Sequence, residues 1–163
     1  MDNSIVKLIV SVIACFAAGG IGSLFTFKSI PTWYPGLKKP IYTPPDKVFG
    51  PIWTALYFLM GLSVYLVWQK GLTNDGVLLA FIFFWVQLVL NALWSIIFFG
   101  MRSKGGGVIT IIILWLLILA TIITSFNVSG WAGTLLIPYI IWVSIASYLN
   151  IGIWWLNKPI KNT

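Results

Sequence analysis

Five long apolar runs, separated by short polar, glycine-rich or proline-rich breaks, dominate the pattern along the chain. A membrane-spanning helix needs about 20 mostly apolar residues, and each run is close to that length. The pattern therefore predicts an all-α integral membrane protein, in which a five-transmembrane-helix bundle forms a single domain over residues 1–163. The predicted spans cover about 5–27, 48–68, 77–99, 108–126 and 131–156.

The first run could be mistaken for a signal peptide, but it is too long for a typical apolar core and its small residues lie inside it. We interpret it as a retained helix. Small residues recur every four positions along it, and such a face permits close helix packing. They are Ala14, Ala18 and Gly22, and beside them Cys15, Gly19 and Ser23.

Composition excludes several classes of protein. Hydrophobic residues make up 60% of the chain and charged residues 8%, whereas a soluble domain carries about 25% charged residues. A soluble enzyme, a disordered protein and a nucleic-acid binder are therefore excluded, despite a net charge of +7. The chain has no His, one Cys and three acids near the ends of predicted spans. We therefore expect no metal site built from the usual ligands and no His-dependent nucleophilic catalysis.

The cations are unevenly distributed between the two ends of the predicted bundle. Cytoplasmic loops of membrane proteins carry the excess of Lys and Arg. The rule predicts that the C-terminus and the connection between the first two spans (loop 1–2, residues 28–47) are cytoplasmic, and that the N-terminus is outside. The short N-terminus without a transit peptide favours a bacterial cell membrane. The richer side carries Lys28, Lys38, Lys39, Lys47, Arg102, Lys104, Lys158 and Lys161, and the other carries Lys7 and Lys70.

The connection over 28–47 is rich in proline and aromatic residues. Proline fixes φ and prevents helix formation, so this segment is expected to fold back as a stiff loop. Trp33, Tyr34 and Tyr42 give it an apolar side. It is either a lid over a central pocket or a passive cap at the membrane interface.

Uncharged polar residues fall in register inside the spans. Gln87, Asn91 and Ser95 share one helical face, and Asn150 lies one turn from Ala146 on another. Buried amides need partners, so both faces are expected to point inward, either for hydrogen bonds between helices or to line a tryptophan-walled cavity. Pro138 is expected to kink the entrance of the last helix.

Several motifs resemble the TspO/translocator-protein family, also called tryptophan-rich sensory proteins or peripheral benzodiazepine receptors. They are W-Y-P-G-L-K-K-P (33–40), P-P-D-K-V-F-G-P-I-W (44–53), Q-L-V-L-N-A-L-W (87–94), F-F-G-M-R (98–102) and P-Y-I-I-W (138–142). The resemblance implies a homodimer in the lipid bilayer that binds protoporphyrin IX and related tetrapyrroles, together with synthetic isoquinoline-carboxamide or benzodiazepine ligands.

Tetrapyrrole sensing, transport or light-dependent degradation is the implied role, with the porphyrin as ligand or substrate and no other cofactor. The alternative is a structural or regulatory membrane interaction protein without catalytic turnover. Trp53 and Trp142 match the family's tryptophans associated with porphyrin chemistry and would be catalytic in an enzyme. Carried over residue by residue, the ligand-binding set is Ser23, Thr26, Trp33, Tyr34, Pro44, Trp53, Gln87, Asn91, Trp94, Trp142, Ala146, Leu149 and Asn150.

Two departures from the family pattern affect the expected ligands. The run 149–156 lacks the Tyr followed by Arg or Lys of the animal sterol motif, which predicts weak sterol binding. Gly105, Gly106 and Gly107 stand where animal members place a pocket tryptophan, which predicts a wider pocket there. At the cavity mouth, Lys38 and Lys39 either neutralise propionates or act only as cytoplasmic cations.

Overall fold

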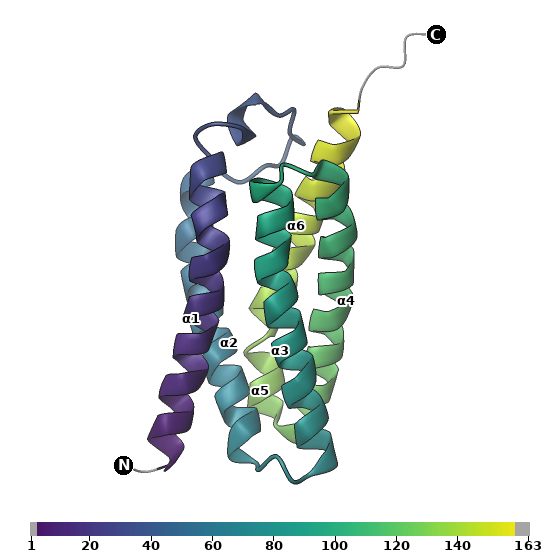
Figure 1. The fold of residues 1–163 in the computed structure, drawn as a ribbon. Helices are drawn as coiled ribbons and strands as arrows, with labels where there is room; N and C mark the ends of the chain where they lie inside the picture. Colours follow the sequence, from purple (N-terminus) through teal and green to yellow (C-terminus); the bar gives the residue numbers. More distant parts are fainter. Residues whose placement is uncertain (1–2, 159–163) are drawn as a thin grey trace.

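The computed structural model describes residues 3–158, except for the side chain of Asp75, and no strand occurs among these residues (Figure 1). Lys161, which was counted with the cytoplasmic cations, lies outside the described residues. Five segments are long and apolar enough to cross a membrane, which confirms the predicted fold class. The elements are α1 (Asn3–Ser29), the 3-10 turns η1 (Tyr34–Gly36) and η2 (Asp46–Val48), α2 (Phe49–Gln69), α3 (Asp75–Ser95), the π-helical turn η3 (Ile96–Gly100), α4 (Lys104–Val128), α5 (Gly130–Thr134) and α6 (Ile137–Leu156).

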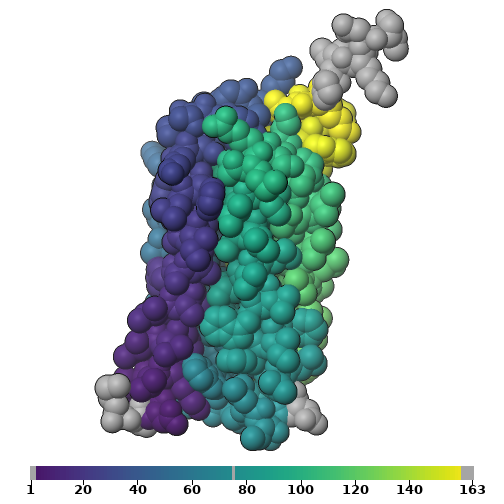
Figure 2. Space-filling model, in the orientation of Figure 1, coloured from purple at the N-terminus to yellow at the C-terminus, as the bar shows by residue number. Residues whose placement is uncertain are grey.

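The helices run side by side along the long axis of the molecule (Figure 1). Helix α1 packs against α2 and α3, α3 packs against α4, and α4 packs against α6. Loop 1–2 closes the end of the bundle where α6 finishes, and α1 begins at the opposite end. Figure 2 shows the same elongated shape, with loop 1–2 and the end of α6 adjacent at the top.

The outer surface of the bundle is apolar. Large aliphatic side chains point outward from the predicted spans, among them Ile13, Leu24 and Ile109, each more than 60% exposed. An exposed apolar surface this extensive marks contact with a partner or a membrane. Because these helices are long enough to span a bilayer, we interpret the surface as the one that contacts lipid. The polar side chains between the helices are instead buried and mostly hydrogen-bonded, as a low-dielectric environment requires.

Small residues let α1 approach its neighbours closely. A Cβ atom added at Gly19 would lie 2.4 Å from the Tyr57 ring, and one added at Gly22 would lie 3.0 Å from Ser95 Oγ. On the facing helix, a Cβ atom at Gly61 would lie 2.8 Å from Val12 Cα. A side chain at any of these positions would force its neighbours to move, so glycine allows the close approach of the helices. The predicted close-packing face of the first helix is therefore confirmed.

Two local expectations were wrong. The last span is not one continuous helix kinked at its entrance, because α5 ends at Thr134 and a separate helix, α6, begins at Ile137 with Pro138 in its first turn. Proline is favoured at that position because the first-turn N–H groups have no helical partner. The three glycines do not form a break either, because α4 begins at Lys104 and Ser103 Oγ accepts from the Gly106 N–H at 3.2 Å. That hydrogen bond is an N-terminal cap.

Candidate functional site

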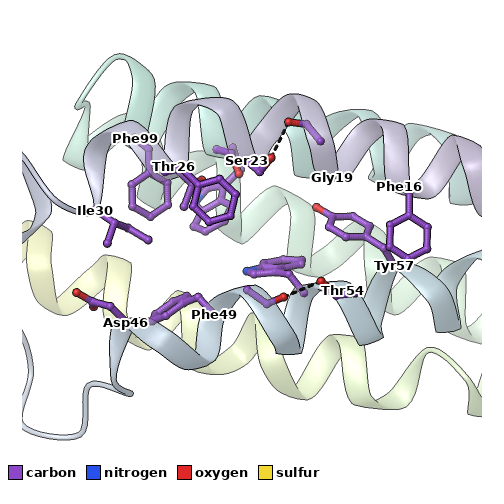
Figure 3. Close-up of a pocket in the computed structure, with 16 residues that line it drawn as sticks. Phe16, Gly19, Ser23, Thr26, Ile30, Asp46, Phe49, Thr54, Tyr57 and Phe99 are labelled. Carbon is purple, nitrogen blue, oxygen red and sulfur yellow. Dashed lines mark hydrogen bonds between the residues drawn. The ribbon is translucent and has the colours of Figure 1, made fainter.

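A cleft of about 290 Å³ lies between α1 and α2, near the end of the bundle that carries loop 1–2 (Figure 3). Its floor is formed by aromatic residues of α2, α3 and η3. Its mouth includes Phe27, which is 65% exposed on the membrane-facing side. The residues that line it are Phe16, Gly19, Gly20, Ser23, Thr26, Phe27, Ile30, Asp46, Phe49, Gly50, Trp53, Thr54, Tyr57, Trp94, Ser95 and Phe99.

Helical periodicity explains how two helices build the walls. Side chains three and four positions apart lie on one face of a helix. Along α1 the lining residues recur at this spacing from Phe16 to Ile30, and along α2 they recur from Phe49 to Tyr57. Because Gly20 and Gly50 carry no side chain, they leave open space between the two faces, whereas Gly19 lets the Tyr57 ring pack against α1.

Aromatic rings form the floor of the cleft. Trp53 stacks on Tyr57, with ring centroids 5.5 Å apart and an interplanar angle of 26°. Trp94 follows at 6.2 Å from Trp53, and Tyr139 lies 6.3 Å from Trp53 in an edge-to-face contact. Aromatic pairs favour offset-stacked and edge-to-face geometries. The floor therefore offers flat, apolar and well-supported surfaces to a ligand.

Three hydroxyl groups of the cleft are already used as donors. Ser23 Oγ donates to the Gly20 carbonyl at 2.8 Å, and Thr54 Oγ1 donates to the Gly50 carbonyl at 2.9 Å (Figure 3). Thr26 Oγ1 donates in the same way to its own helix at 3.2 Å. A hydroxyl has one hydrogen and two acceptor lone pairs, so these groups present acceptors to the cleft and favour a ligand with N–H or O–H donors.

Two of the predicted amides lie beneath the floor. Tyr57 Oη donates to Asn91 Oδ1 at 2.7 Å, and Asn91 Nδ2 donates to Tyr139 Oη at 2.8 Å. Tyr139 Oη in turn donates to Gln87 Oε1 at 2.8 Å. This chain joins α2, α3 and α6 in the buried core. Gln87 and Asn91 therefore support the cleft through hydrogen bonds between helices, which is the first of the two alternatives for their face.

A second, much smaller space of about 10 Å³ lies under loop 1–2, and Phe49, Trp94 and Phe99 separate it from the cleft. Trp94 Nε1 donates to Asn150 Oδ1 at 3.2 Å on its border. The predicted residues are thus divided between two places, since Ser23, Thr26, Trp53 and Trp94 line the cleft. Those that line the smaller space are Tyr34, Trp94, Ala146, Leu149 and Asn150.

Besides Gln87 and Asn91, three predicted site residues line neither space. Trp142 is buried and contacts Phe49 edge to face, with centroids 5.5 Å apart. Trp33 packs its ring against Phe98 at 5.6 Å. Pro44 lies half-buried in loop 1–2. Each of the three residues lies near the site but lines neither the cleft nor the smaller space.

The widening expected at the three glycines is absent. A Cβ atom at Gly107 would lie 2.6 Å from the Phe98 ring and 2.9 Å from Asn150 Oδ1, and one at Gly106 would lie 2.7 Å from Ser103 Oγ. Neighbouring side chains therefore occupy the room that a larger residue would take. None of the three glycines lines the cleft or the smaller space.

The charged group at the cleft is acidic. Asp46 lines the cleft, and neither Lys38 nor Lys39 does. Lys39 Nζ lies 4.5 Å from the centre of the Tyr34 ring instead. Burial, and secondarily the nearby Asp46 carboxylate, raise the pKa of Tyr34 to about 12. Tyr34 is therefore neutral throughout the physiological pH range.

Loop 1–2 is attached to the end of α6 by one side chain. Asn157 Oδ1 accepts from the Lys38 backbone N–H at 3.0 Å, and Asn157 Nδ2 donates to the Lys38 carbonyl at 2.8 Å. A Cβ atom at Gly152 would lie 2.3 Å from Pro40 Cγ, so the loop also touches the α6 backbone. These contacts hold the loop over the bundle as a fixed cover.

Replacing Asn157 by alanine should loosen this cover, because both hydrogen bonds to the Lys38 backbone are lost. We expect trypsin to cleave the Lys38–Lys39 bond about three- to tenfold faster in Asn157→Ala, as scored by mass spectrometry of the purified protein. This range corresponds to about 0.6–1.4 kcal/mol for opening the loop, the lower part of what two hydrogen bonds contribute at about 0.5–1.5 kcal/mol each, because both bonds are exposed to solvent. Asn127→Ala, an exposed position on α4, is the control, and equal cleavage in both variants would contradict the attachment.

Sequence reasoning missed most of the lining residues. Phe16, Gly20, Ile30 and Phe99 were not predicted, nor were Asp46, Phe49, Thr54, Tyr57 and Ser95 as ligand contacts. The available signal was the helical spacing from Ser23 and Thr26 along the first helix, and from Trp53 along the second.

The fold and the site together define a class: a five-helix membrane protein with an aromatic-floored cleft under a proline-rich loop. The chain belongs to the TspO/MBR family, whose model matches residues 11–156. It is 45% identical over 154 residues to the tryptophan-rich protein TspO of Archaeoglobus fulgidus, covering 94% of this chain and 99% of that protein. It is 38% identical to the protein CrtK of Rhodobacter capsulatus, over 91% of this chain and 92% of the relative. It is 36% identical to the human translocator protein, over 87% of this chain and 82% of the relative.

Proposed function

We propose that this protein binds porphyrins such as protoporphyrin IX in the cleft between α1 and α2, and acts in tetrapyrrole sensing, transport or light-dependent degradation. The observation that carries the proposal is the cleft floor, where Trp53, Tyr57 and Trp94 present flat rings between two apolar helices. Ligand sites are typically apolar with a few placed polar groups. Synthetic translocator-protein ligands of the isoquinoline-carboxamide and benzodiazepine types suit the same surface.

The polar groups favour a metal-free porphyrin. The residues that line the cleft include no His, Cys or Met, the side chains that most often bind haem iron axially. The inner N–H groups of a metal-free porphyrin point to the centre of the macrocycle and therefore need no partner from the protein, whereas haem iron takes axial ligands. The chemistry of the lining residues therefore supports protoporphyrin over haem as the ligand.

Light-dependent degradation is favoured by one further observation, the position of Trp53 at the cleft surface within van der Waals range of other aromatic rings. An excited porphyrin in the cleft would give one electron to dioxygen, forming a porphyrin radical cation and superoxide, and combination of these two radicals would add both oxygen atoms to the macrocycle. The π face of the Trp53 indole would stabilise the porphyrin radical cation. Trp142, the second tryptophan expected to react, lies behind Phe49.

Binding and degradation are separated by titrating purified protein with protoporphyrin IX in darkness and then under light. Saturable quenching of tryptophan fluorescence in darkness supports binding. A discrete new pigment that forms under light, at a rate that saturates with porphyrin, supports catalysis. Bleaching at the rate seen in protein-free detergent leaves sensing or transport, and quenching that never saturates contradicts the proposed site.

The carboxylate of Asp46 gives a prediction about the ligand's charge. Protoporphyrin carries two propionates, and a like charge at the mouth of the cleft repels them. We expect Asp46→Asn to tighten protoporphyrin binding about two- to fivefold at low salt, since exposed charge pairs contribute about 0.2–1 kcal/mol. The gain should shrink at high salt because of screening. Asp46→Glu is the matched control, and an equal gain in that variant would contradict a charge effect.

For the setting of the protein, we propose a homodimer in a bacterial cell membrane, with loop 1–2 and the C-terminus cytoplasmic and the N-terminus outside. The positive-inside rule supports this orientation, because Lys38, Lys104 and Lys158 lie at the end of the bundle that carries loop 1–2. Weak sterol binding is proposed on the same sequence grounds as above.

A further inference from the structure

Phe49 stands between the two spaces of the site. It is the first residue of α2 and lines both the cleft and the smaller space under loop 1–2. The other two shared rings are firmly held. Trp94 is buried and donates a hydrogen bond to Asn150, and Phe99 is buried against Phe98 with centroids 4.8 Å apart.

The ring of Phe49 has fewer restraints. It is only half-buried, and its single close ring contact among the described residues is the edge-to-face pair with Trp142. Its neighbour on the cleft side is open space. Phe49 is therefore the member of the dividing wall that can move with the least loss of packing.

An unused donor lies behind this ring. Trp142 is 7% exposed, and its Nε1–H group has no hydrogen-bond partner among the described residues. Buried N–H groups are nearly always paired. The smaller space nearby, about 10 Å³, has room for about one water molecule at most. In this arrangement the Trp142 indole is closed off from any ligand in the cleft.

We propose that Phe49 is a movable partition that sets the size of ligand the protein accepts. With the ring in place, the cleft of about 290 Å³ is at the lower limit for drug-sized ligands, roughly 300–1,000 Å³. When the ring swings toward the membrane-facing mouth, the cleft joins the space beside Ala146, and the Trp142 N–H reaches the enlarged pocket. A large planar ligand with a hydrogen-bond acceptor then occupies both spaces, while a small ligand needs the cleft alone.

The first test does not depend on any ligand. Ala146, which lines the smaller space, is replaced by cysteine in a Cys15→Ala background, so that it carries the only thiol. The purified protein is treated with N-ethylmaleimide, and labelling is followed by mass spectrometry. We expect Phe49→Ala to accelerate labelling at least tenfold and Phe49→Trp to slow it. Phe27→Ala, which enlarges only the mouth of the cleft, is the control and should leave the rate unchanged.

Equal labelling in all four backgrounds would overturn the proposal, and so would an equal acceleration by Phe27→Ala. Leu149→Cys is the second reporter position, for use if the Ala146→Cys protein does not fold. Leu149 lines the same space, and we expect the same changes in its labelling rate.

The second test rests on the proposed function and uses protoporphyrin IX together with indole as a small aromatic probe. Phe49→Trp should weaken protoporphyrin binding at least fivefold and change indole binding less than twofold. Equal effects on both ligands would overturn the role in size selection. If wild-type protein binds no protoporphyrin while the thiol labelling still depends on Phe49, the proposed function fails and the partition stands.

Discussion

Trp53→Leu should weaken protoporphyrin IX binding by about tenfold or more. Leucine keeps an apolar side chain in the cleft but removes the flat indole that stacks on Tyr57. Aromatic pairs contribute about 0.5–1.5 kcal/mol beyond the burial of their surface, and the smaller side chain also buries less of the ligand. A loss of 1.4 kcal/mol is tenfold in affinity. The measurement is a dark fluorescence titration in detergent micelles.

Trp131→Leu is the matched control for this result. Trp131 lies in α5 and is 74% exposed, away from the residues that line the cleft. Its replacement should leave the protoporphyrin dissociation constant within a factor of two. Equal weakening in both variants would show that the loss of any tryptophan affects the readout, and would contradict a specific contact with Trp53.

Asn91→Ala should lower the free energy of unfolding by about 2–3 kcal/mol. The substitution leaves the Tyr57 hydroxyl without its acceptor and removes one donor from Tyr139, which keeps Gln87 as its own acceptor. Hydrogen bonds between membrane helices contribute only about 0.6 kcal/mol on average. Leaving a buried donor unpaired costs more, about 1–3 kcal/mol. This cost, and not the average hydrogen bond, sets the expected loss of unfolding free energy.

The measurement is unfolding in mixed micelles by increasing fractions of sodium dodecyl sulfate, followed by circular dichroism. Asn127→Ala is the control, because Asn127 is exposed near the end of α4. Surface substitutions of this kind usually change stability by less than about 0.5 kcal/mol. A change that small for Asn91→Ala would contradict the hydrogen-bonded chain between α2, α3 and α6.

The five spans could be predicted because length and hydrophobicity alone define a membrane helix. The ends of the helices were less accessible to sequence reasoning. The glycines after Ser103 were interpreted as a break, although the cap that Ser103 makes lets α4 begin before them. The π-helical turn η3 carries no strong sequence signal, since it depends on how Phe98 and Phe99 pack and on the hydrogen bond from Ser29 Oγ to the Phe99 carbonyl at 2.6 Å.

The candidate site was partly predictable for a related reason. Ser23 and Trp53 lie on helical faces whose direction follows from periodicity, and both line the cleft. Asn91 also points inward as expected, but the sequence could not show whether an inward amide meets a cavity or a partner. In the structure the Asn91 amide is hydrogen-bonded to two tyrosine hydroxyls, those of Tyr57 and Tyr139. The position of Trp142 behind Phe49 depends on the packing of two rings from distant segments, which periodicity does not determine.

The central claim is that the cleft between α1 and α2 holds the porphyrin, and blocking it sterically is the most direct measurement. Gly20 lines the cleft, and a Cβ atom there would meet nothing within 4 Å, so Gly20→Phe fills the cleft without a backbone clash. Gly76→Phe is the control, at an equally open glycine on α3 that does not line the cleft. In a dark protoporphyrin titration, we expect saturable quenching to be lost in Gly20→Phe and retained in Gly76→Phe. Wild-type affinity in Gly20→Phe would contradict the central claim.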